Sequence, residues 1–370
     1  MFPPLLDIIA LTLLFLHFSV ALAYYRYLKG YKDKSWRLKI DKEYRPYVTT
    51  IVPTHNEGQV IERRLDNLAN QEYPKDKQRI IVVDSASTDN TALIVEEWLR
   101  ANPSVNGTLI SEPERNGKFK ALQKAMTVVE PTSVAVILTD ADALWDPTAL
   151  SEVTSFLADP EVGSVTGNIK YVNDSGALSE DTYRDYYNTV RVAESKIHST
   201  PIHNGPLLAI RNGFLCKIVF SSYLGSDDCT LGSLVAFAGY RAIQADTAAV
   251  REFVRNRLRG KIRRSVGVLR TFHHTKKYAK KMHVYVRSKF EIVWRMQWWL
   301  NVVNPWILFA GIILLVSEVV ISGSLLASAV LLIGLLSLGL KMFRTWMLQQ
   351  VYLVLGALRN LWTDDAIWNR

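Results

Sequence analysis

Two aspartates, Asp140 and Asp142, follow an apolar run at residues 134–138. The run is typical of a buried parallel strand, and an open α/β sheet binds its ligands at the carboxyl ends of its strands. Mg²⁺ is commonly held by one or two carboxylates together with substrate phosphates. Because no basic residue adjoins the pair in the sequence, we expect Asp140 and Asp142 to hold a divalent cation against a diphosphate. On this short pattern alone, a polar turn is the simpler interpretation.

Two other predicted strands also lead into polar residues. One ends just before Thr54 and Glu57, whose spacing predicts a capping box at the start of a helix. The other, residues 79–83, ends at Asp84, which could accept hydrogen bonds from a ribose or a base. The alternative is a capped turn, with Asp89 as the helix cap. Acids at successive strand ends would share one edge of the sheet, which turn chemistry alone does not explain.

Three further charged residues open predicted helices. Lys118 begins a helix that runs to Met126 and could reach a phosphate, although most lysines at such positions are solvated. Asp227 and Asp228 begin another helix, which ends near Gly239. Adjacent carboxylates at a helix start favour the macrodipole, and they could equally provide a general base.

Strand and helix patterns alternate from residue 47 to residue 142. This order predicts an α/β fold, a Rossmann-like and mostly parallel sheet with helices on both faces. The second half is less regular, although residues 162–172 have a strand pattern. We therefore expect the acids at successive strand ends, Glu57, Asp84, Asp140 and Asp142, to gather at one edge of the sheet.

Apolar segments lie at both ends of the 370-residue chain. Leu5–Tyr25 is long enough to cross about 30 Å of hydrocarbon. A cleaved signal peptide is the alternative, but the segment lacks a basic start. Val302–Leu340 could form two spans with a turn at Ser322–Ser324, and Trp346–Leu358 is either a further span or an interfacial helix.

The formal net charge of +9 is concentrated beside these segments. Basic residues between positions 26 and 45 favour a cytoplasmic location for the large polar region C-terminal to them, with Met1 outside. Basic residues at 261–281, followed by tryptophans, are typical of interfacial helices that face anionic lipids. This placement argues against a nucleic-acid surface, and two cysteines suggest neither a disulfide framework nor a zinc site.

The sequence thus predicts a multi-pass protein of the cell membrane. Its expected parts are an N-terminal transmembrane helix (1–28), a basic interfacial linker (29–46), a cytoplasmic domain (47–250), basic and aromatic interfacial helices (251–301) and a C-terminal transmembrane region (302–370).

Residues 47–270 resemble, in the same order, the family 2 inverting glycosyltransferases of the GT-A fold, in particular the hyaluronan, chitin and cellulose synthase-like group. The matching segments are Ile51–Glu57 (opening strand and loop), Val82–Thr91 (nucleotide-binding turn, with Ser85 where a second acid is usual), Asn116–Lys118 (near the diphosphate), Asp140–Asp142 (metal motif), Asn204–Leu207 with Arg211 (acceptor side), and Asp227–Leu231 with Gly239 and Tyr240 (acceptor activation).

This resemblance implies roles for individual residues. Donor-binding residues would be Pro53, Thr54, Glu57, Asp84, Lys118, Asp140 and Arg263; Asp140 and Asp142 would bind Mg²⁺ or Mn²⁺; Asp228, supported by Asp227, would be the catalytic base; and Asn204, Gly205 and Arg211 would bind the acceptor.

One motif of the processive family members is altered here. They carry Gln-x-x-Arg-Trp before the C-terminal spans, and the best match is Gly260–Arg264, which keeps Arg263 but has Gly260 for Gln and Arg264 for Trp. In the family that tryptophan stacks on the acceptor sugar, so its loss argues against a polymer-secreting synthase.

We therefore expect a membrane-bound inverting glycosyltransferase. It would move a sugar from a cytosolic nucleotide sugar, with UDP as the expected nucleotide, to a lipid-linked or other glycan acceptor near the bilayer. The alternatives are a processive polysaccharide synthase that extrudes its polymer and a nucleotide-binding membrane protein without transfer activity.

Overall fold

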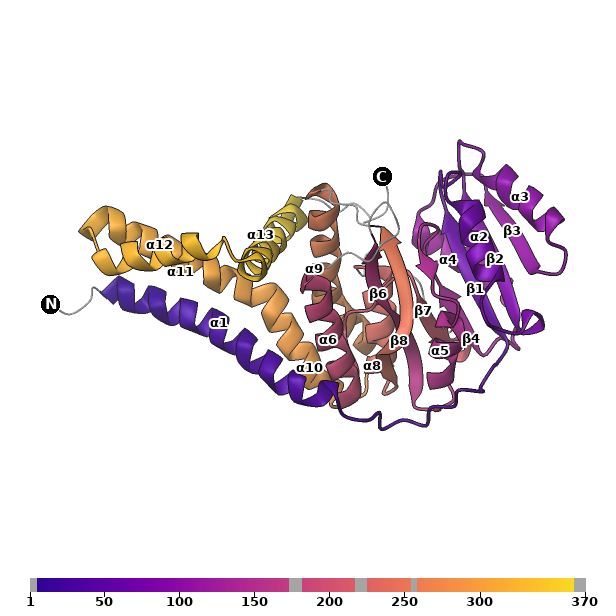
Figure 1. Cartoon of the computed structure of the whole chain (residues 1–370), viewed down its shortest axis with the longest axis horizontal. Helices are drawn as coiled ribbons and strands as arrows, with labels where there is room; N and C mark the ends of the chain where they lie inside the picture. The colour runs from indigo at the N-terminus through magenta and orange to yellow at the C-terminus, as the bar shows by residue number, and fades with distance from the viewer. Residues whose placement is uncertain (1–4, 173–181, 217–224, 254–257, 363–370) are drawn as a thin grey trace.

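A mixed eight-stranded sheet forms the centre of the large domain (Figure 1). The computed structural model describes residues 5–172, 182–216, 225–253 and 258–362. The strands lie in the order β3-β2-β1-β4-β7-β6-β8-β5. Their bounds are β1 (Val48–Thr54), β2 (Gln78–Ser85), β3 (Asn106–Glu112), β4 (Ala135–Leu138), β5 (Leu144–Trp145), β6 (Val162–Val172), β7 (Leu208–Arg211) and β8 (Arg241–Phe253). Strands β1 to β4 are parallel to one another, as predicted, whereas β7 runs antiparallel to β4 and β6.

Helices cover both faces of the sheet, which confirms the predicted layers. Side chains alternate along β1, so that Val48 and Val52 join one core and Ile51 joins the other. On the first face lie α2 (Ile61–Ala69), α3 (Thr91–Ala101) and α5 (Ala149–Phe156). On the second lie α4 (Lys118–Met126), α8 (Asp227–Phe237), α9 (Leu258–Lys281) and α10 (Phe290–Trp298). Helices α6 (Thr182–Ile197) and α7 (Asn212–Leu215) flank β7 in the sequence.

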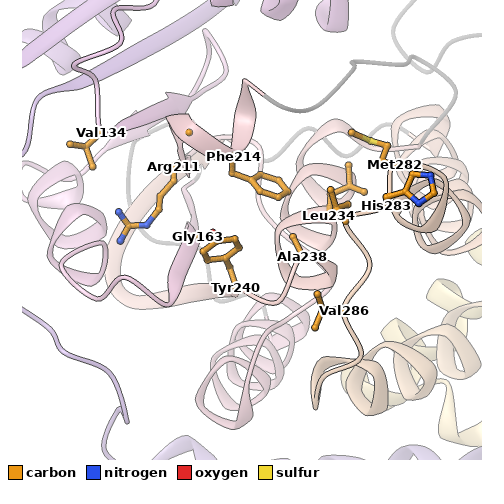
Figure 2. Close-up of a pocket in the computed structure, with 12 residues that line it drawn as sticks. Val134, Gly163, Arg211, Phe214, Leu234, Ala238, Tyr240, Met282, His283 and Val286 are labelled. Carbon is orange, nitrogen blue, oxygen red and sulfur yellow. The ribbon is translucent and has the colours of Figure 1, made fainter.

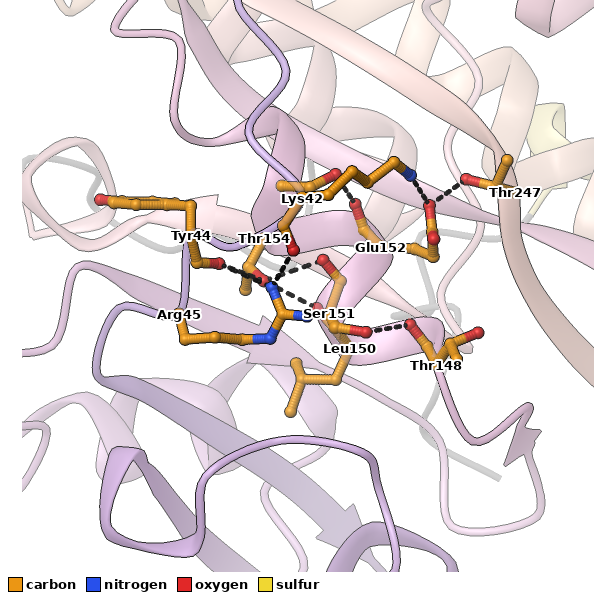
Figure 3. Close-up of polar contacts among 10 residues, drawn as sticks. Lys42, Tyr44, Arg45, Thr148, Leu150, Ser151, Glu152, Thr154 and Thr247 are labelled. Carbon is orange, nitrogen blue, oxygen red and sulfur yellow. Dashed lines mark hydrogen bonds and ion pairs between the residues drawn. The ribbon is translucent and has the colours of Figure 1, made fainter.

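The linker between α1 (Leu5–Lys32) and β1 lies along the large domain (Figure 1). Trp36 packs edge-on against Phe156 of α5, with ring centroids 5.0 Å apart. Lys42 forms an ion pair with Glu152 at 2.5 Å, and the Thr247 hydroxyl donates to the same carboxylate (Figure 3). These contacts hold the linker against the large domain.

Apolar helices extend away from the sheet (Figure 1). Among the residues that the structure describes, two helices are long and apolar enough to cross a membrane, Leu5–Lys32 and Phe290–Ser322. The second joins α10 to α11 (Asn304–Ser322) through a π-helical turn. A third span is counted only if α12 (Leu325–Ser337) and α13 (Lys341–Trp362), which are bent by 106°, are taken as one.

Polar contacts tie the apolar helices together. Gly323 ends α11 with a φ of 65° and Ser324 caps α12, which confirms the predicted turn. The Ser324 hydroxyl also donates to Asp7 at 2.7 Å. The Trp346 indole, which can only donate, bonds His17 Nε2 at 3.0 Å, so His17 Nδ1 carries the proton and donates to the Asn304 carbonyl at 3.1 Å. Helix α1 is thereby fastened to α11, α12 and α13.

Candidate active site

The carboxyl ends of β1, β2 and β4 lie at the edge of the sheet where β7 begins. Leu208 pairs with Leu138, so the antiparallel β7 begins where β4 ends. Gly205, just before β7, therefore lies among charged groups: a Cβ atom built on it would be 3.4 Å from Asp140 Oδ2, 3.5 Å from Asp228 Oδ2 and 3.8 Å from Lys118 Nζ. Residues from four separate segments of the sequence thus surround one small space.

Lys118, at the start of α4, bridges two of the predicted motifs. Its Nζ lies 2.8 Å from Asp140 Oδ1 and 2.8 Å from Asp227 Oδ2. Burial disfavours the charged lysine, but the attraction of Asp140 and Asp227 outweighs burial and raises the pKa of Lys118 above its usual value. The expectation that Asp140 has no basic partner is therefore wrong, because the partner comes from a distant helix.

Asp228 has the environment of a general base. Helix α8 begins at Asp227, and Asp228 accepts hydrogen bonds from the Ser226 hydroxyl and, at 2.8 Å, from the backbone N–H of Cys229. Burial, and next the charge of Asp227, raises the pKa of Asp228 to about 6. A carboxyl group with this pKa is mostly ionised at neutral pH and can still accept a proton effectively.

Asp140 and Asp142 form a donor set that fits a cation arriving with a diphosphate. Within the described ranges, no group of three or more His, Cys, Asp or Glu side chains could hold a metal by itself. Two carboxylates suit Mg²⁺ or Mn²⁺, because such ions complete their coordination with water and phosphate oxygens. The side chain of Asp140 is 33% exposed, so one of its sides remains accessible.

Arg263 of α9 contributes positive charge near this pair. Burial and the charges of Arg264 and Arg359 lower the pKa of Arg263, while the nearby Asp140 acts in the opposite direction. The structure therefore places the arginine retained from the altered motif within electrostatic reach of Asp140. Clustered guanidinium groups at this edge are suited to a diphosphate.

Hydrogen bonds connect the end of β1 and the loop after it with the end of β2 and the residues after it. Asp84 is 4% exposed and accepts hydrogen bonds from the Ser87 hydroxyl, from Ser87 N–H at 3.1 Å and from the Thr54 hydroxyl at 3.4 Å. The Glu57 N–H donates to the Thr91 hydroxyl at 2.9 Å. Pro53 pairs with Val83 in the adjacent strands.

The predicted capping box is wrong. Helix α2 begins at Ile61 and Thr54 ends β1, so neither residue of the predicted box lies at the start of the helix; the Glu57 backbone carbonyl accepts from the N–H groups of Val60 and Ile61. Contacts with the loop after β2 keep the intervening residues out of the helix: Asn56 N–H donates to the Ser87 hydroxyl, and Thr88 N–H donates to the Asn56 side chain.

The residues predicted on the acceptor side separate in the structure. Asn204 is buried, accepts a 2.6 Å hydrogen bond from Arg191 and donates to the Gly167 carbonyl at 2.9 Å, so its side chain holds the loop that carries Gly205. Arg211 pairs with Ala135 at the opposite end of β4.

The antiparallel direction of β7 thus carries Arg211 away from the carboxylates, and its binding of the acceptor stays a prediction. Its guanidinium donates to the carbonyls of Leu157, Asp159 and Val162 at 2.6–2.7 Å. Arg211 lines a different pocket of about 590 Å³, together with Phe214 (Figure 2).

Sequence reasoning missed Arg64 of α2, whose charge interacts with Asp140 and Asp142. It is fully buried, and both carboxylates act on its charge. Arg64 shares a helix face with the buried Ile61 and Leu68, so a charged residue within an apolar stripe was the available signal.

Comparisons with known proteins agree with this geometry. Residues 49–215 match the family described as Glycosyl transferase family 2, and residues 135–351 match Glycosyl transferase family group 2. A mannosyltransferase from Pyrobaculum calidifontis, solved in complex with GDP-Man and Mn²⁺, superposes with a TM-score of 0.86 and 36% identity, covering 98% of this chain and 100% of the other.

Curated relatives match over shorter regions. Glycosyltransferase AglE of Haloferax volcanii is 28% identical over 151 residues, which are 40% of this chain and 48% of AglE. A poly-beta-1,6-N-acetyl-D-glucosamine synthase of Staphylococcus aureus is 29% identical over 134 residues, 36% of this chain and 31% of the synthase. The chain thus spans half or less of these two relatives. Together, the fold, the family matches and the full-length structural relative show that the chain belongs to glycosyl transferase family 2 and is a glycosyltransferase of the GT-A fold.

Proposed function

We propose that the protein transfers a sugar, with inversion, from a nucleoside diphosphate sugar to an acceptor hydroxyl close to the membrane surface. The observation that carries this proposal is the convergence of Asp140, Lys118 and Asp228 around Gly205. A group that neutralises a diphosphate and a group that accepts a proton then border the same small space.

Each charged group has a defined task in this mechanism. Asp228 takes the proton of the acceptor hydroxyl as that oxygen attacks the anomeric carbon. Lys118 and Arg263 stabilise the negative charge that develops on the departing diphosphate. A divalent cation held by Asp140 and Asp142 would supply Lewis-acid stabilisation of the same leaving group. Attack from the side opposite the leaving group inverts the anomeric centre without a covalent intermediate on the enzyme.

The donor is a nucleotide sugar bound at the ends of β1 and β2. The buried Asp84 and the loop after it lie at the carboxyl end of β2, which β1 separates from β4 and the Asp140–Asp142 segment. The mannosyltransferase that resembles the whole chain was solved with GDP-Man, so GDP-mannose is the first donor to test. UDP-sugars, which the sequence pattern favoured, are the second.

The acceptor is a lipid-linked or membrane-proximal glycan. Helix α9, which carries Arg263, packs closely on α13: a Cβ atom on Gly356 would lie 2.9 Å from Ser265 Cβ. The helix that supplies Arg263 is therefore attached to the apolar part of the chain. The missing tryptophan of the processive motif favours a single transfer over polymer extrusion.

A donor and acceptor screen tests the proposal. Purified full-length protein in lipid nanodiscs is incubated with labelled GDP-mannose or UDP-sugars and with extracted membrane lipids, and the products are sized. We expect a lipid-extractable product carrying one added sugar, lost in excess chelator and restored by Mn²⁺ or Mg²⁺. A long polymer would support the processive alternative, and undiminished transfer in chelator would contradict the cation site.

A further inference from the structure

Arg64 is a buried charge that forms no ion pair with a carboxylate of the described residues. Its side chain is fully buried in α2. It donates to Asn67 Oδ1 and to Thr139 Oγ1, each at 2.6 Å, and its guanidinium lies 4.4 Å from the centre of the Trp145 ring. Burying a charge is costly unless good contacts compensate, so these neutral contacts call for a reason beyond packing.

The contacts of Arg64 enclose the segment that carries Asp140 and Asp142. Thr139 directly precedes this segment, and Trp145 lies shortly after it. Asn67, one helical turn after Arg64, adds two hydrogen bonds to the Trp145 backbone: its Oδ1 accepts from Trp145 N–H at 2.8 Å, and its Nδ2 donates to the Trp145 carbonyl at 2.8 Å. Helix α2 therefore forms hydrogen bonds with Thr139 and Trp145, on both sides of the Asp140–Asp142 segment.

The same network reaches the loop that carries Gly205. The Pro206 carbonyl accepts hydrogen bonds from the Thr139 hydroxyl and from the Trp145 indole N–H, each at 2.7 Å. Since Thr139 uses its hydroxyl hydrogen for Pro206, its oxygen is left to accept from Arg64. Arg64 thus fixes the direction of the Thr139 hydroxyl, and the hydroxyl fixes the neighbouring loop.

From this closed network we infer that Arg64 is a positioning residue for sugar transfer, holding the Asp140–Asp142 segment and the Gly205–Pro206 loop in register. The inference rests on the proposed function, because those two segments separate the cation side of the site from Asp228. A buried guanidinium suits this task better than an ammonium, because its planar fork can bond Asn67 and Thr139 while it stacks on Trp145.

The decisive variant is Arg64→Lys, which keeps the charge and removes the fork. Because the charge is retained, a change in cation binding reports the position of the carboxylates. We expect a folded protein that binds Mn²⁺ more weakly in the presence of GDP or UDP, measured by calorimetry. Its kcat should fall on the order of 10- to 100-fold, since small displacements of reacting groups cost rate of this size, while the donor KM changes little.

Two further variants complete the experiment. Arg63→Lys makes the same exchange at an exposed position of α2 and should leave kcat and Mn²⁺ binding unchanged. Thr139→Val removes the hydroxyl that links Arg64 to Pro206 while Arg64 itself is unchanged, and should lower kcat, whereas Thr139→Ser should preserve it. If Arg64→Lys does not fold, the two Thr139 variants decide the inference.

The outcomes separate this inference from the proposed function. Wild-type kcat and Mn²⁺ binding in folded Arg64→Lys, or in Thr139→Val, would overturn the positioning role. A wild-type protein that transfers no sugar from any donor would defeat the proposed function instead. In that case weaker Mn²⁺ binding by Arg64→Lys with GDP or UDP would still support the positioning of the carboxylates, and unchanged binding would refute it.

Discussion

Lys118 shows how a single residue connects the chemistry of this site. It contacts Asp140 on the cation side and Asp227 beside the proposed base, each at 2.8 Å. The positive charge of Lys118 also lowers the pKa of Asp228, against the effects of burial and of Asp227. The ammonium group of Lys118 therefore couples the charge at Asp140, on the donor side, to the pKa of Asp228, on the acceptor side.

Asp228→Asn should abolish most transfer while the fold and nucleotide binding survive. Asparagine keeps the size of the side chain and much of its hydrogen bonding at the helix start, but it cannot take a proton. General-base assistance is typically worth about 10²- to 10⁴-fold, so kcat should fall by that factor at saturating donor, with binding measured separately.

Asp227→Asn is the matched control at the adjacent position. It removes one carboxylate from buried Lys118, so we expect a stability loss on the order of 3 kcal/mol and a smaller loss of rate. Near-normal turnover in Asp228→Asn with loss in Asp227→Asn would identify Asp227 as the base. If neither substitution lowers turnover, acceptor activation by this acid pair is refuted.

The acidic limb of the pH profile should report Asp228. Its pKa is raised to about 6 by burial and by the charge of Asp227, so the carboxyl group gains its inactivating proton as the pH falls through that value. We expect kcat/KM to decline about tenfold per pH unit below about pH 6. The limb should disappear in the residual activity of Asp228→Asn. A flat profile of the wild-type enzyme down to pH 5 would contradict the assignment.

At the scale of elements, α8 is seated on the loop before β7 through a close contact at Gly232. A Cβ atom there would lie 2.3 Å from His203 Nδ1, and the His203 ring is almost completely buried. His203 immediately precedes Asn204, so this contact sets the distance between the helix of Asp228 and the loop of Gly205.

Gly232→Ala should therefore lower both stability and turnover. Overpacking a filled core typically costs about 1–3 kcal/mol, which a thermal or denaturant unfolding experiment would measure. Gly260→Ala is the control, because a Cβ atom at that helical glycine meets nothing within 4 Å and should be neutral or slightly stabilising. If Gly232→Ala and Gly260→Ala had equal stability and equal turnover, the contact between Gly232 and His203 would not determine either property.

At the scale of the whole molecule, the turn at Ser322–Ser324 and Asp7 lie at the same end of the apolar helices. The linker and the large domain continue from the other end of α1 (Figure 1). If α1 spans the bilayer, the turn and the large domain must lie on opposite sides. The basic residues after Tyr25 predict that the large domain is cytoplasmic.

Cysteine labelling tests this topology. In a background with Cys216 and Cys229 replaced, Lys34→Cys should resist an impermeant thiol reagent in intact cells, and Leu325→Cys should react. Both positions are exposed on the protein, so permeabilised cells should label both and serve as the control. Labelling of Lys34→Cys alone in intact cells would reverse the orientation.

The sequence by itself determined the parts whose signals are local. The strands that end near Asp84 and Asp140, the start of α8 at Asp227, and the turn at Gly323 follow from side-chain periodicity and from the conformational preferences of single residues. The apolar helices follow from nearly uncharged runs whose length suits about 30 Å of hydrocarbon.

Only the tertiary structure decided how these parts meet. The antiparallel direction of β7 places Gly205 between Asp140 and Asp228 and moves Arg211 to the far end of the sheet. Lys118 reaches both acids because helix packing brings distant segments together. Such contacts depend on strand direction and register, which a linear pattern of residue types does not encode.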